Sequence, residues 1–397
     1  MGRFSECLKN ELVDNILPFW ISRMKVASGG FYGRMDGKGT VYREAERGAI
    51  LNARILWTFA SAYRVLGVEE YLESALHSFR YITDHFIDRQ YGGVYWSLNP
   101  DGSPRDTKKQ FYAIAFTIYA LAELYRAAGN CEALDLAKEL FLCIEEHSSD
   151  REGTGYIEAC TRDWGTISDM RLSDKDQNDA KTMNTHLHIL EGYTNLYRVW
   201  KDENLAASLK NLIVIFLDRI IRPDGHLGLF FGEDWAPHST AVSYGHDIEA
   251  SWLLCEAAEV LGDAELLARV KAVSGKVASA ALEAYSHDGG MEYEYDPANG
   301  HHNFSRDWWV QAETVVGCVN QFQLTGGKVW LERALSEWEF IRRHIICPDG
   351  EWYWAAVPDG NGGFVPNTDD DRAGFWKCPY HNGRMCLEII ERLSGTD

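Results

Sequence analysis

A histidine and a glutamate lie three residues apart at the start of the apolar segment SYGHDIEASWL, residues 243–253. On an α-helix, His246 and Glu249 differ by about 60° around the axis and therefore share a face. A histidine transfers protons near neutral pH and a carboxylate can orient it, so acid–base catalysis is the leading interpretation. A metal site and a solvated first turn are the alternatives.

The metal alternative has little support in the sequence. In di-iron bundles the motif is Glu-x-x-His, the reverse order, and it occurs twice. In this sequence we count His246 and Glu249 as a single copy of a His-x-x-Glu motif. The zinc motif His-Glu-x-x-His is absent. The glycines precede aromatic residues rather than a Lys-Ser/Thr pair, so a phosphate-binding loop is not indicated. We expect no metal and no other cofactor.

Other polar side chains occur near the N-terminal ends of six apolar helical patterns. They are Asn52 and Arg54, Gln110 and Tyr112, Asn184 and His188, His246 and Glu249, Trp309 and Glu313, and His381 with Trp376. A buried polar group is costly unless it lines a cavity or finds a partner. If these helices run in the same direction, the polar groups converge at one end of the fold.

The elements that carry these residues repeat along the chain. Segments rich in glycine and aromatic residues recur every 60–70 residues or so, at 29–39, 92–102, 153–164, 223–235, 289–300 and 349–363. Each is expected to form a short hairpin or an irregular loop. Apolar residues at helical spacing predict helices at 5–25, 45–66, 69–87, 108–128, 131–147, 180–200, 203–221, 246–261, 264–284, 306–325, 328–346 and 380–393.

Three features favour a closed ring over an open solenoid. The period is uniform although the repeats are not sequence copies, no polar capping repeat is visible, and each chain end supplies one helix. We therefore predict an all-α fold, a single (α/α)6-barrel catalytic domain over residues 1–397. It has six apolar inner helices, six amphipathic outer helices, and short β-hairpins or loops at one mouth.

The composition of the chain disfavours nucleic acids and membranes as partners. The chain has 397 residues, 46% of them hydrophobic, and a net charge of −20. An acidic surface disfavours nucleic acid, and neither a polybasic patch nor an apolar run of about 18 residues indicates a membrane. The N-terminus lacks a signal-peptide pattern, and nine cysteines without Cys-x-x-Cys spacing are typical of thiols in a reducing cytoplasm. We expect a cytoplasmic protein, monomeric or weakly homo-oligomeric.

Not every histidine in these segments is expected to do chemistry. His186 and His188 are about 200° apart on a helix, so only one can face inward. His188 shares a face with Asn184, so we assign His188 to the site and His186 to the structure. His301 and His302 lie in a Gly/Asn-rich segment and are expected to be exposed.

Five segments resemble the signature segments of the cellobiose 2-epimerases, a family within the N-acylglucosamine 2-epimerase superfamily of (α/α)6 barrels. They are RGAILNARILWTFASAY, KTMNTHLHILEGYTNLY, SYGHDIEASWLL, WWVQAETVVG and WKCPYHNGRMCLEII. The resemblance runs through nearly the whole chain. It implies an isomerase that inverts C2 of the reducing-end sugar of a β-1,4-linked disaccharide such as cellobiose.

The resemblance also implies roles for single residues. His246 and His381 match the two acid/base histidines, His188 matches a third active-site histidine, and Arg54 matches the arginine near the C1 and C2 oxygens of the sugar. The other matches are carboxylates that orient histidines or bind hydroxyls (Glu249, Glu313), aromatic walls (Trp309, Trp376) and further site residues (Trp252, Asn184). Tyr112 is added as a sugar contact, and we expect Glu249 to orient His246.

These residue types suit the implied reaction. After ring opening, a base removes the C2 proton beside the aldehyde and an enediolate forms, which is then protonated on the other face. Histidine changes its protonation state near neutral pH, and a guanidinium can stabilise the enediolate oxygen. The alternatives are a mannose or N-acylglucosamine epimerase, an aldose–ketose isomerase, a glycoside hydrolase or lyase, and a non-catalytic sugar-binding protein.

Overall fold

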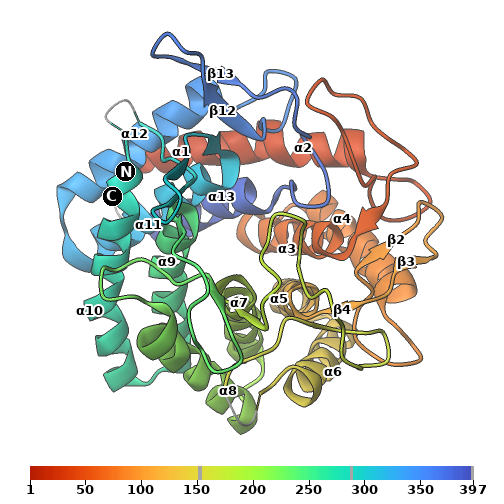
Figure 1. The fold of residues 1–397 in the computed structure, drawn as a ribbon. Helices are drawn as coiled ribbons and strands as arrows, with labels where there is room; N and C mark the ends of the chain where they lie inside the picture. Colours follow the sequence, from red (N-terminus) through yellow and green to blue (C-terminus); the bar gives the residue numbers. More distant parts are fainter. Residues whose placement is uncertain (151–153, 287–288, 395–397) are drawn as a thin grey trace.

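Two concentric rings of helices form the protein. The computed structural model describes residues 1–150, 154–286 and 289–394. Within them the inner helices are α3 (Ala49–Leu66), α5 (Phe111–Ala128), α7 (Met183–Val199), α9 (Tyr244–Leu261), α11 (Trp308–Thr325) and α13 (Tyr380–Leu393). In Figure 1 these helices surround the centre of the molecule and the others lie outside them. The predicted all-α (α/α)6 architecture is confirmed.

The outer ring begins with the N-terminal run α1 (Gly2–Asn10), η1 (Glu11–Ile16), α2 (Leu17–Phe19) and η2 (Trp20–Met24). It continues with α4 (Glu69–Tyr81) and η3 (Ile82–Phe86), α6 (Cys131–His147), α8 (Glu203–Ile215) and η4 (Phe216–Ile220), α10 (Ala264–Ala281) and η5 (Leu282–Ala284), and α12 (Lys328–His344). The outer helices bury one stripe only, whereas α3 and α5 are buried along most of their length. Burial on all sides explains why the inner patterns are almost wholly apolar.

The ring is closed by the two ends of the chain. Inner helices contact one another in the order α3, α5, α7, α9, α11 and α13, and α13 packs back against α3. The helix α1 also packs against α13, so the first and last helices form the sixth pair. Four inner helices end at a glycine with positive φ, namely Gly67, Gly129, Gly262 and Gly326. Only glycine adopts this cap without strain, and this accounts for the sharp return to the outer ring.

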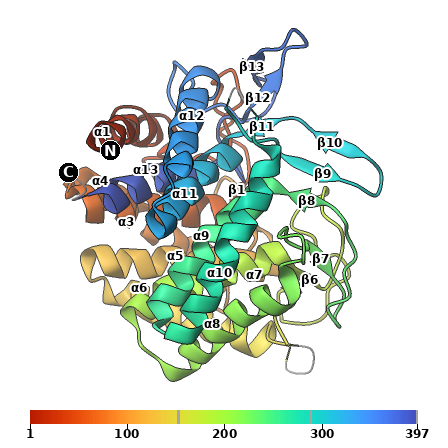
Figure 2. The ribbon, with the colours of Figure 1, turned by 90° about the vertical axis from the view of Figure 1, so that its left-hand side faces the viewer.

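Short strands gather at one mouth of the barrel, as Figure 2 shows. They are β1 (Arg47–Gly48), β2 (Ser97–Leu98), β3 (Pro104–Asp106), β4 (Lys109–Gln110), β5 (Ala159–Cys160), β6 (Lys181–Thr182), β7 (Phe230–Phe231), β8 (Val242–Ser243), β9 (Glu294–Asp296), β10 (His301–Asn303), β11 (Arg306–Asp307), β12 (Ala355–Pro358) and β13 (Phe364–Pro366). Hairpins pair β2 with β3, β9 with β10, and β12 with β13, as expected for the glycine-rich segments.

The strands also link successive repeats. Each of β1, β4, β6, β8 and β11 leads directly into an inner helix and pairs with the first strand of the next glycine-rich segment. Four predicted inner helices therefore began two to four residues early, since 47–48, 109–110, 181–182 and 306–307 are strand residues. Because α3, α5, α7, α9 and α11 all start from this layer, their N-terminal ends lie at the same mouth.

Ion pairs made by a fully buried lysine anchor the starts of three inner helices. Lys109 Nζ lies 3.0 Å from Asp88, Lys181 Nζ 2.7 Å from Asp150, and Lys377 Nζ 2.6 Å from Glu351. In each pair the lysine precedes an inner helix and the acid follows an outer helix. Among the described residues, the helices are too short or too polar to cross a bilayer.

Candidate active site

Eight of the predicted site residues are the second or the sixth residue of an inner helix. Tyr112, Asn184, Trp309 and His381 are second residues, whereas Arg54, His188, Glu249 and Glu313 are sixth residues. Positions four apart lie one turn apart on the same helix face. Since α3, α5, α7, α9 and α11 start from the same layer, this face points to the barrel axis at the strand-bearing mouth.

Two histidines are each held by a carboxylate. His381 Nδ1 lies 2.7 Å from Glu313 Oε1, and His188 Nδ1 lies 2.9 Å from Glu191 Oε2. A carboxylate on Nδ1 keeps the proton on that nitrogen and leaves Nε2 free to accept one. All four side chains are buried. Glu313 thus orients a histidine, as the resemblance implied for it.

His246 has a different environment from the one we expected. Its Nδ1 lies 2.7 Å from Ser243 Oγ, and its ring packs against Trp309 with 4.8 Å between centroids. Glu249 instead accepts a hydrogen bond from Arg384 Nη2 at 2.5 Å. The expectation that Glu249 orients His246 is therefore wrong. Sharing a helix face was not enough, because the stronger donor Arg384 takes the carboxylate.

The buried centre of the site is charged. Arg384 donates to Glu249, to Glu313 at 2.6 Å and to Glu191. Glu249, Glu313 and His381 are close enough together to hold a metal ion. The Arg384 guanidinium already bridges the two carboxylates of that group, so a cation would have to displace it. Glu249 and Glu313 therefore fit the guanidinium of Arg384 rather than a metal ion.

The three histidines are neutral at ordinary pH. Burial lowers the pKa of His188 and of His246 to about 3, and it lowers that of His381 well below the usual value. The nearby Arg54 guanidinium adds to each shift, because it repels a second positive charge. A neutral imidazole can accept a proton, so each histidine is in the form of a general base.

Arg54 lies against an aromatic surface beside these histidines. Its Nη2 donates to the Tyr112 hydroxyl at 2.9 Å, and its guanidinium lies 4.1 Å from the centre of the Phe116 ring. His188 packs against the same Phe116 ring, at 4.6 Å between centroids. Arg54 is almost fully buried. A guanidinium in this position can stabilise negative charge that develops on a ligand oxygen.

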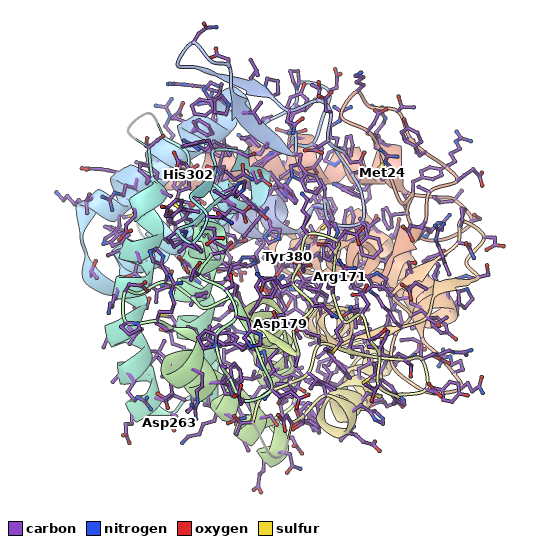
Figure 3. All side chains as sticks on the ribbon, viewed as in Figure 1. Met24, Arg171, Asp179, Asp263, His302 and Tyr380 are labelled. Atoms are coloured by element: carbon purple, nitrogen blue, oxygen red, sulfur yellow. The ribbon has the colours of Figure 1, made fainter. Side chains whose placement is uncertain are left out.

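A cavity of about 280 Å³ opens at this mouth. Asn184 and His246 line its inner end, and its outer wall includes residues of the 170–179 segment and of the β9–β10 hairpin. Figure 3 views the molecule from the same side, with Arg171, Asp179 and Tyr380 near the centre of the ring. Asn184 Oδ1 is buried and has no hydrogen-bond partner, which suits an atom that awaits a ligand hydroxyl.

Known proteins share this arrangement of helices and this sequence. The profile of the family described as N-acylglucosamine 2-epimerase (GlcNAc 2-epimerase) matches residues 30–370. This chain belongs to that family. The cellobiose 2-epimerase of Bacteroides fragilis is 55% identical over 386 residues, which are 96% of this chain and 97% of that protein. The resemblance seen in the sequence is confirmed.

Solved structures agree with this assignment. The cellobiose 2-epimerase from Bacillus thermoamylovorans B4167 superposes with a TM-score of 0.94 at 40% identity, covering 99% of this chain and 100% of that one. A D-mannose isomerase superposes with a TM-score of 0.84 at 21% identity, covering 98% of each chain, and shares the fold. This member of the epimerase family is thus similar to cellobiose 2-epimerases over nearly its entire length.

The predicted aromatic residues of this epimerase-family chain occupy two layers. Trp309 and Trp376 lie near the mouth, and Trp376 packs against Tyr112 at 6.1 Å between centroids. Trp252 is 1% exposed, donates to Glu313 Oε2 at 3.1 Å and lies under the Arg384 guanidinium. Its predicted role as a substrate contact is therefore wrong, because Trp252 supports the carboxylates from below.

The prediction that His186 is structural agrees with its contacts. The backbone N–H of Tyr156 donates to His186 Nε2 at 2.9 Å, and Nδ1 lies 2.6 Å from the Thr182 carbonyl oxygen. Both ring nitrogens are therefore occupied. His301 is exposed on β10 as expected, while His302 is half-buried against Glu292.

Sequence reasoning missed three residues of the buried centre, namely Glu191, Tyr380 and Arg384. Tyr380 and Arg384 both bond to Glu191, and Arg384 also bonds to the Tyr380 hydroxyl. A signal existed for Glu191, because His188 and Glu191 repeat the His-x-x-Glu spacing of residues 246 and 249. That spacing is thus not a single copy, contrary to our expectation, and the overlooked pair is the one that forms a hydrogen bond.

Proposed function

We propose that this protein is a carbohydrate 2-epimerase that interconverts glucose and mannose configurations at the reducing end of β-1,4-linked disaccharides such as cellobiose. One observation carries the proposal. The Trp309 ring lies 4.8 Å from the ring of His246 and 5.7 Å from that of His381. A sugar placed against this indole lies near both imidazoles, and inversion at C2 requires one group that removes a proton and a second group that supplies a proton to the opposite face. The similarity to cellobiose 2-epimerases supports the choice of substrate.

In the proposed mechanism, the ring-opened sugar presents its C2 proton to one of these two histidines. The histidine takes the proton, the C2–H electron pair moves into the C1–C2 bond, and negative charge collects on the C1 oxygen. Arg54 stabilises that charge, because a guanidinium stays protonated and is already fixed in place. The other histidine first takes a proton from solvent and then gives it to the opposite face of C2, as the C1 carbonyl re-forms. Proton transfer of this kind contributes roughly 10²–10⁴-fold to a rate.

The supporting residues have distinct roles in this proposal. Glu313 fixes the tautomer of His381, and Glu191 does the same for His188, which exchanges protons with sugar oxygens. Asn184, Tyr112 and Trp376 contact the sugar at the mouth. Glu249 stays bound to Arg384. The reaction needs neither a metal nor a redox cofactor, since a proton leaves and a proton returns.

The proposal also covers the domain organisation, the location, the oligomeric state and the partners of the protein. The whole chain acts as one catalytic domain in the cytoplasm, as a monomer or weak homo-oligomer. It binds a small sugar and no nucleic acid. Its nine cysteines are free thiols, which suits a reducing compartment.

The experiment is to incubate the purified protein with cellobiose and separate the products. The proposal expects glucosyl-mannose, a product with the mass of cellobiose. Glucose as the product would instead indicate a hydrolase. A glucosyl-fructose product would indicate an aldose–ketose isomerase, in which the enediolate is protonated at C1. Cellobiose that binds but remains unchanged would indicate a binding protein.

A further inference from the structure

Arg384 joins four inner helices at a single guanidinium. It belongs to α13 and is fully buried. Its Nη2 lies 2.5 Å from Glu249 Oε1 on α9 and 2.6 Å from Glu313 Oε1 on α11, and its Nη1 bonds to Glu191 Oε1 on α7. The guanidinium lies between the rings of Trp252 and Tyr380, at 4.8 and 4.4 Å from their centroids.

Two of these three carboxylates hold histidines of the site. Glu313 uses the same Oε1 atom for Arg384 and for His381 Nδ1. Glu191 uses Oε1 for Arg384 and Oε2 for His188 Nδ1. Arg384 itself is separated from the cavity by these groups, because it is fully buried below them. It therefore reaches the histidines only through the carboxylates.

Three carboxylates cannot stay ionised together in a buried space without a cation. Burial raises the pKa of Glu313 to about 8, the charge of Glu249 contributes to this rise, and Arg384 opposes both effects. The groups facing Glu313 are Arg384, Glu249 and His381, and the other charges around His381 are Arg54, His188 and His246. Without Arg384 the pKa of Glu313 rises further, so Glu313 offers His381 a charged acceptor over a narrower range of pH.

We propose that Arg384 is the positioning residue that holds Glu313 and Glu191 in place and favours their ionised forms, and so fixes the orientation and tautomer of His381 and His188. The inference rests on the proposed function, because it assigns Arg384 a task in that reaction. It makes Arg384 essential for the chemical step although Arg384 does not touch the sugar. Sugar binding should depend little on it, because Asn184 and Trp309 lie at the mouth.

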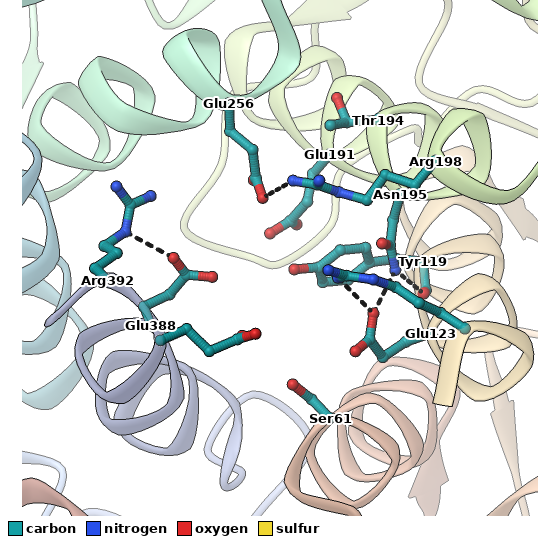
Figure 4. A network of polar contacts seen from close by, with 12 residues as sticks. Ser61, Tyr119, Glu123, Glu191, Thr194, Asn195, Arg198, Glu256, Glu388 and Arg392 are labelled. Atoms are coloured by element: carbon teal, nitrogen blue, oxygen red, sulfur yellow. Dashed lines mark hydrogen bonds and ion pairs between the residues drawn. The ribbon is translucent and has the colours of Figure 1, made fainter. Parts of the chain in front are cut away.

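The barrel supplies a matched control. At the other ends of the inner helices, Arg198 of α7 bonds to Glu256 of α9 at 2.5 Å. Figure 4 shows this pair with the neighbouring Arg392–Glu388 pair. Arg198 also joins two inner helices, but none of its hydrogen bonds in the described structure reaches a histidine. The Arg198→Met variant therefore measures how much kcat changes when an ion pair between two inner helices is broken without affecting a histidine.

The experiment compares Arg384→Lys, Arg384→Met and Arg198→Met with the parent protein on cellobiose over a range of pH. For Arg384→Met we expect kcat to fall about 10²-fold or more with KM within about threefold of the parent. We also expect the acid limb of its pH profile to move to higher pH, because Glu313 must then lose its proton without help. Arg384→Lys should recover part of kcat, since it restores charge but not the three-way bridge. Arg198→Met should keep the parent kcat and pH profile.

A double variant tests whether Arg384 acts through Glu313. Residues that work as a unit give non-additive losses. Glu313→Gln combined with Arg384→Met should lose much less kcat than the product of the two separate losses, because Arg384 then acts only through Glu191 and His188. If Arg384→Met is insoluble, the same comparison is made with Arg384→Lys, which keeps the buried charge balanced.

The outcomes separate the two proposals. No epimerisation by the parent protein would contradict the proposed function. Epimerisation by the parent together with an Arg384→Lys variant of unchanged kcat and pH profile would contradict the inference alone. Fully additive losses in the double variant would also contradict the inference, because Arg384 would then act independently of Glu313.

Discussion

His381 and Glu313 lie 2.7 Å apart although 68 residues separate them in the chain. The contact joins α13 to α11, the last and fifth inner helices. It depends on closure of the barrel, because α13 reaches the axis only when the two ends of the chain pack together. The proposed acid–base group is thus completed by the last helix of the ring.

The first prediction concerns this contact. Glu313→Gln should lower kcat on cellobiose by about 10²-fold or more, because an amide can stabilise the wrong tautomer of His381. Glu337→Gln is the control, since Glu337 is equally buried on α12 and bonds to the Gly290 N–H. Steady-state kinetics of both variants provide the measurement. Equal losses in the two would mean that burial, not the histidine contact, is responsible.

The second prediction distinguishes the two tryptophan layers. Trp309→Ala should raise KM about three- to tenfold, since stacking of an aromatic ring contributes about 1 kcal/mol. Trp252→Phe should leave KM near the parent value and lower kcat, because it removes the hydrogen bond to Glu313 Oε2. A larger rise in KM for Trp252→Phe would show that this residue touches the sugar after all.

The third prediction is a pH dependence of stability. Burial lowers the pKa of His186 to about 4, whereas an unfolded chain has a histidine pKa of about 6.5. Between these values only the unfolded state is protonated, so acidification favours unfolding by about 1.4 kcal/mol per pH unit. The free energy of unfolding of the parent relative to His186→Asn should fall at that rate from about pH 6 to about pH 4.5. Urea unfolding measures it, and a constant difference would contradict a neutral His186.

The fourth prediction concerns metals. Extensive dialysis against EDTA should leave kcat on cellobiose unchanged, because Arg384 already neutralises Glu249 and Glu313. Atomic absorption on the dialysed sample provides the control for metal removal. Activity that disappears and returns with a divalent cation would place a metal at these carboxylates.

The fifth prediction tests a buried ion pair of the scaffold. Lys377→Met should lower the free energy of unfolding by about 3–5 kcal/mol, since Glu351 is left charged and fully buried. Lys210→Met breaks the exposed Lys210–Asp263 pair and should lower the free energy of unfolding far less, because solvent screens that pair. Denaturant unfolding compares the two, and equal effects would mean that the buried pair adds nothing specific.

Local rules made most of the fold predictable. The inner helices are apolar on all sides, and Gly67, Gly129, Gly262 and Gly326 mark their ends, so element type and order follow from the sequence. The strands before the inner helices were not predictable, because two residues are too few to show an alternating pattern. Their pairing joins segments that are about 50 or more residues apart, and no local signal encodes it.

The site was predictable where residue type and helix position sufficed. His188, His246, His381 and Arg54 all face the mouth, as position along the inner helices suggested. The hydrogen-bond partners were not predictable, because they depend on which side chains meet across the barrel axis. Arg384 shows this most clearly, since its sequence neighbours do not indicate that three helices direct carboxylates at it.

The most direct test of the proposed function is proton exchange at C2 of the sugar. Cellobiose is incubated with the protein in D₂O and followed by NMR, beside His246→Asn and His381→Asn variants. We predict deuterium at C2 in a glucosyl-mannose product, loss of the product in each variant, and loss of exchange into cellobiose in the variant that lacks the base for this sugar. A glucosyl-mannose product without deuterium, or exchange that survives in both variants, would contradict proton transfer by these histidines.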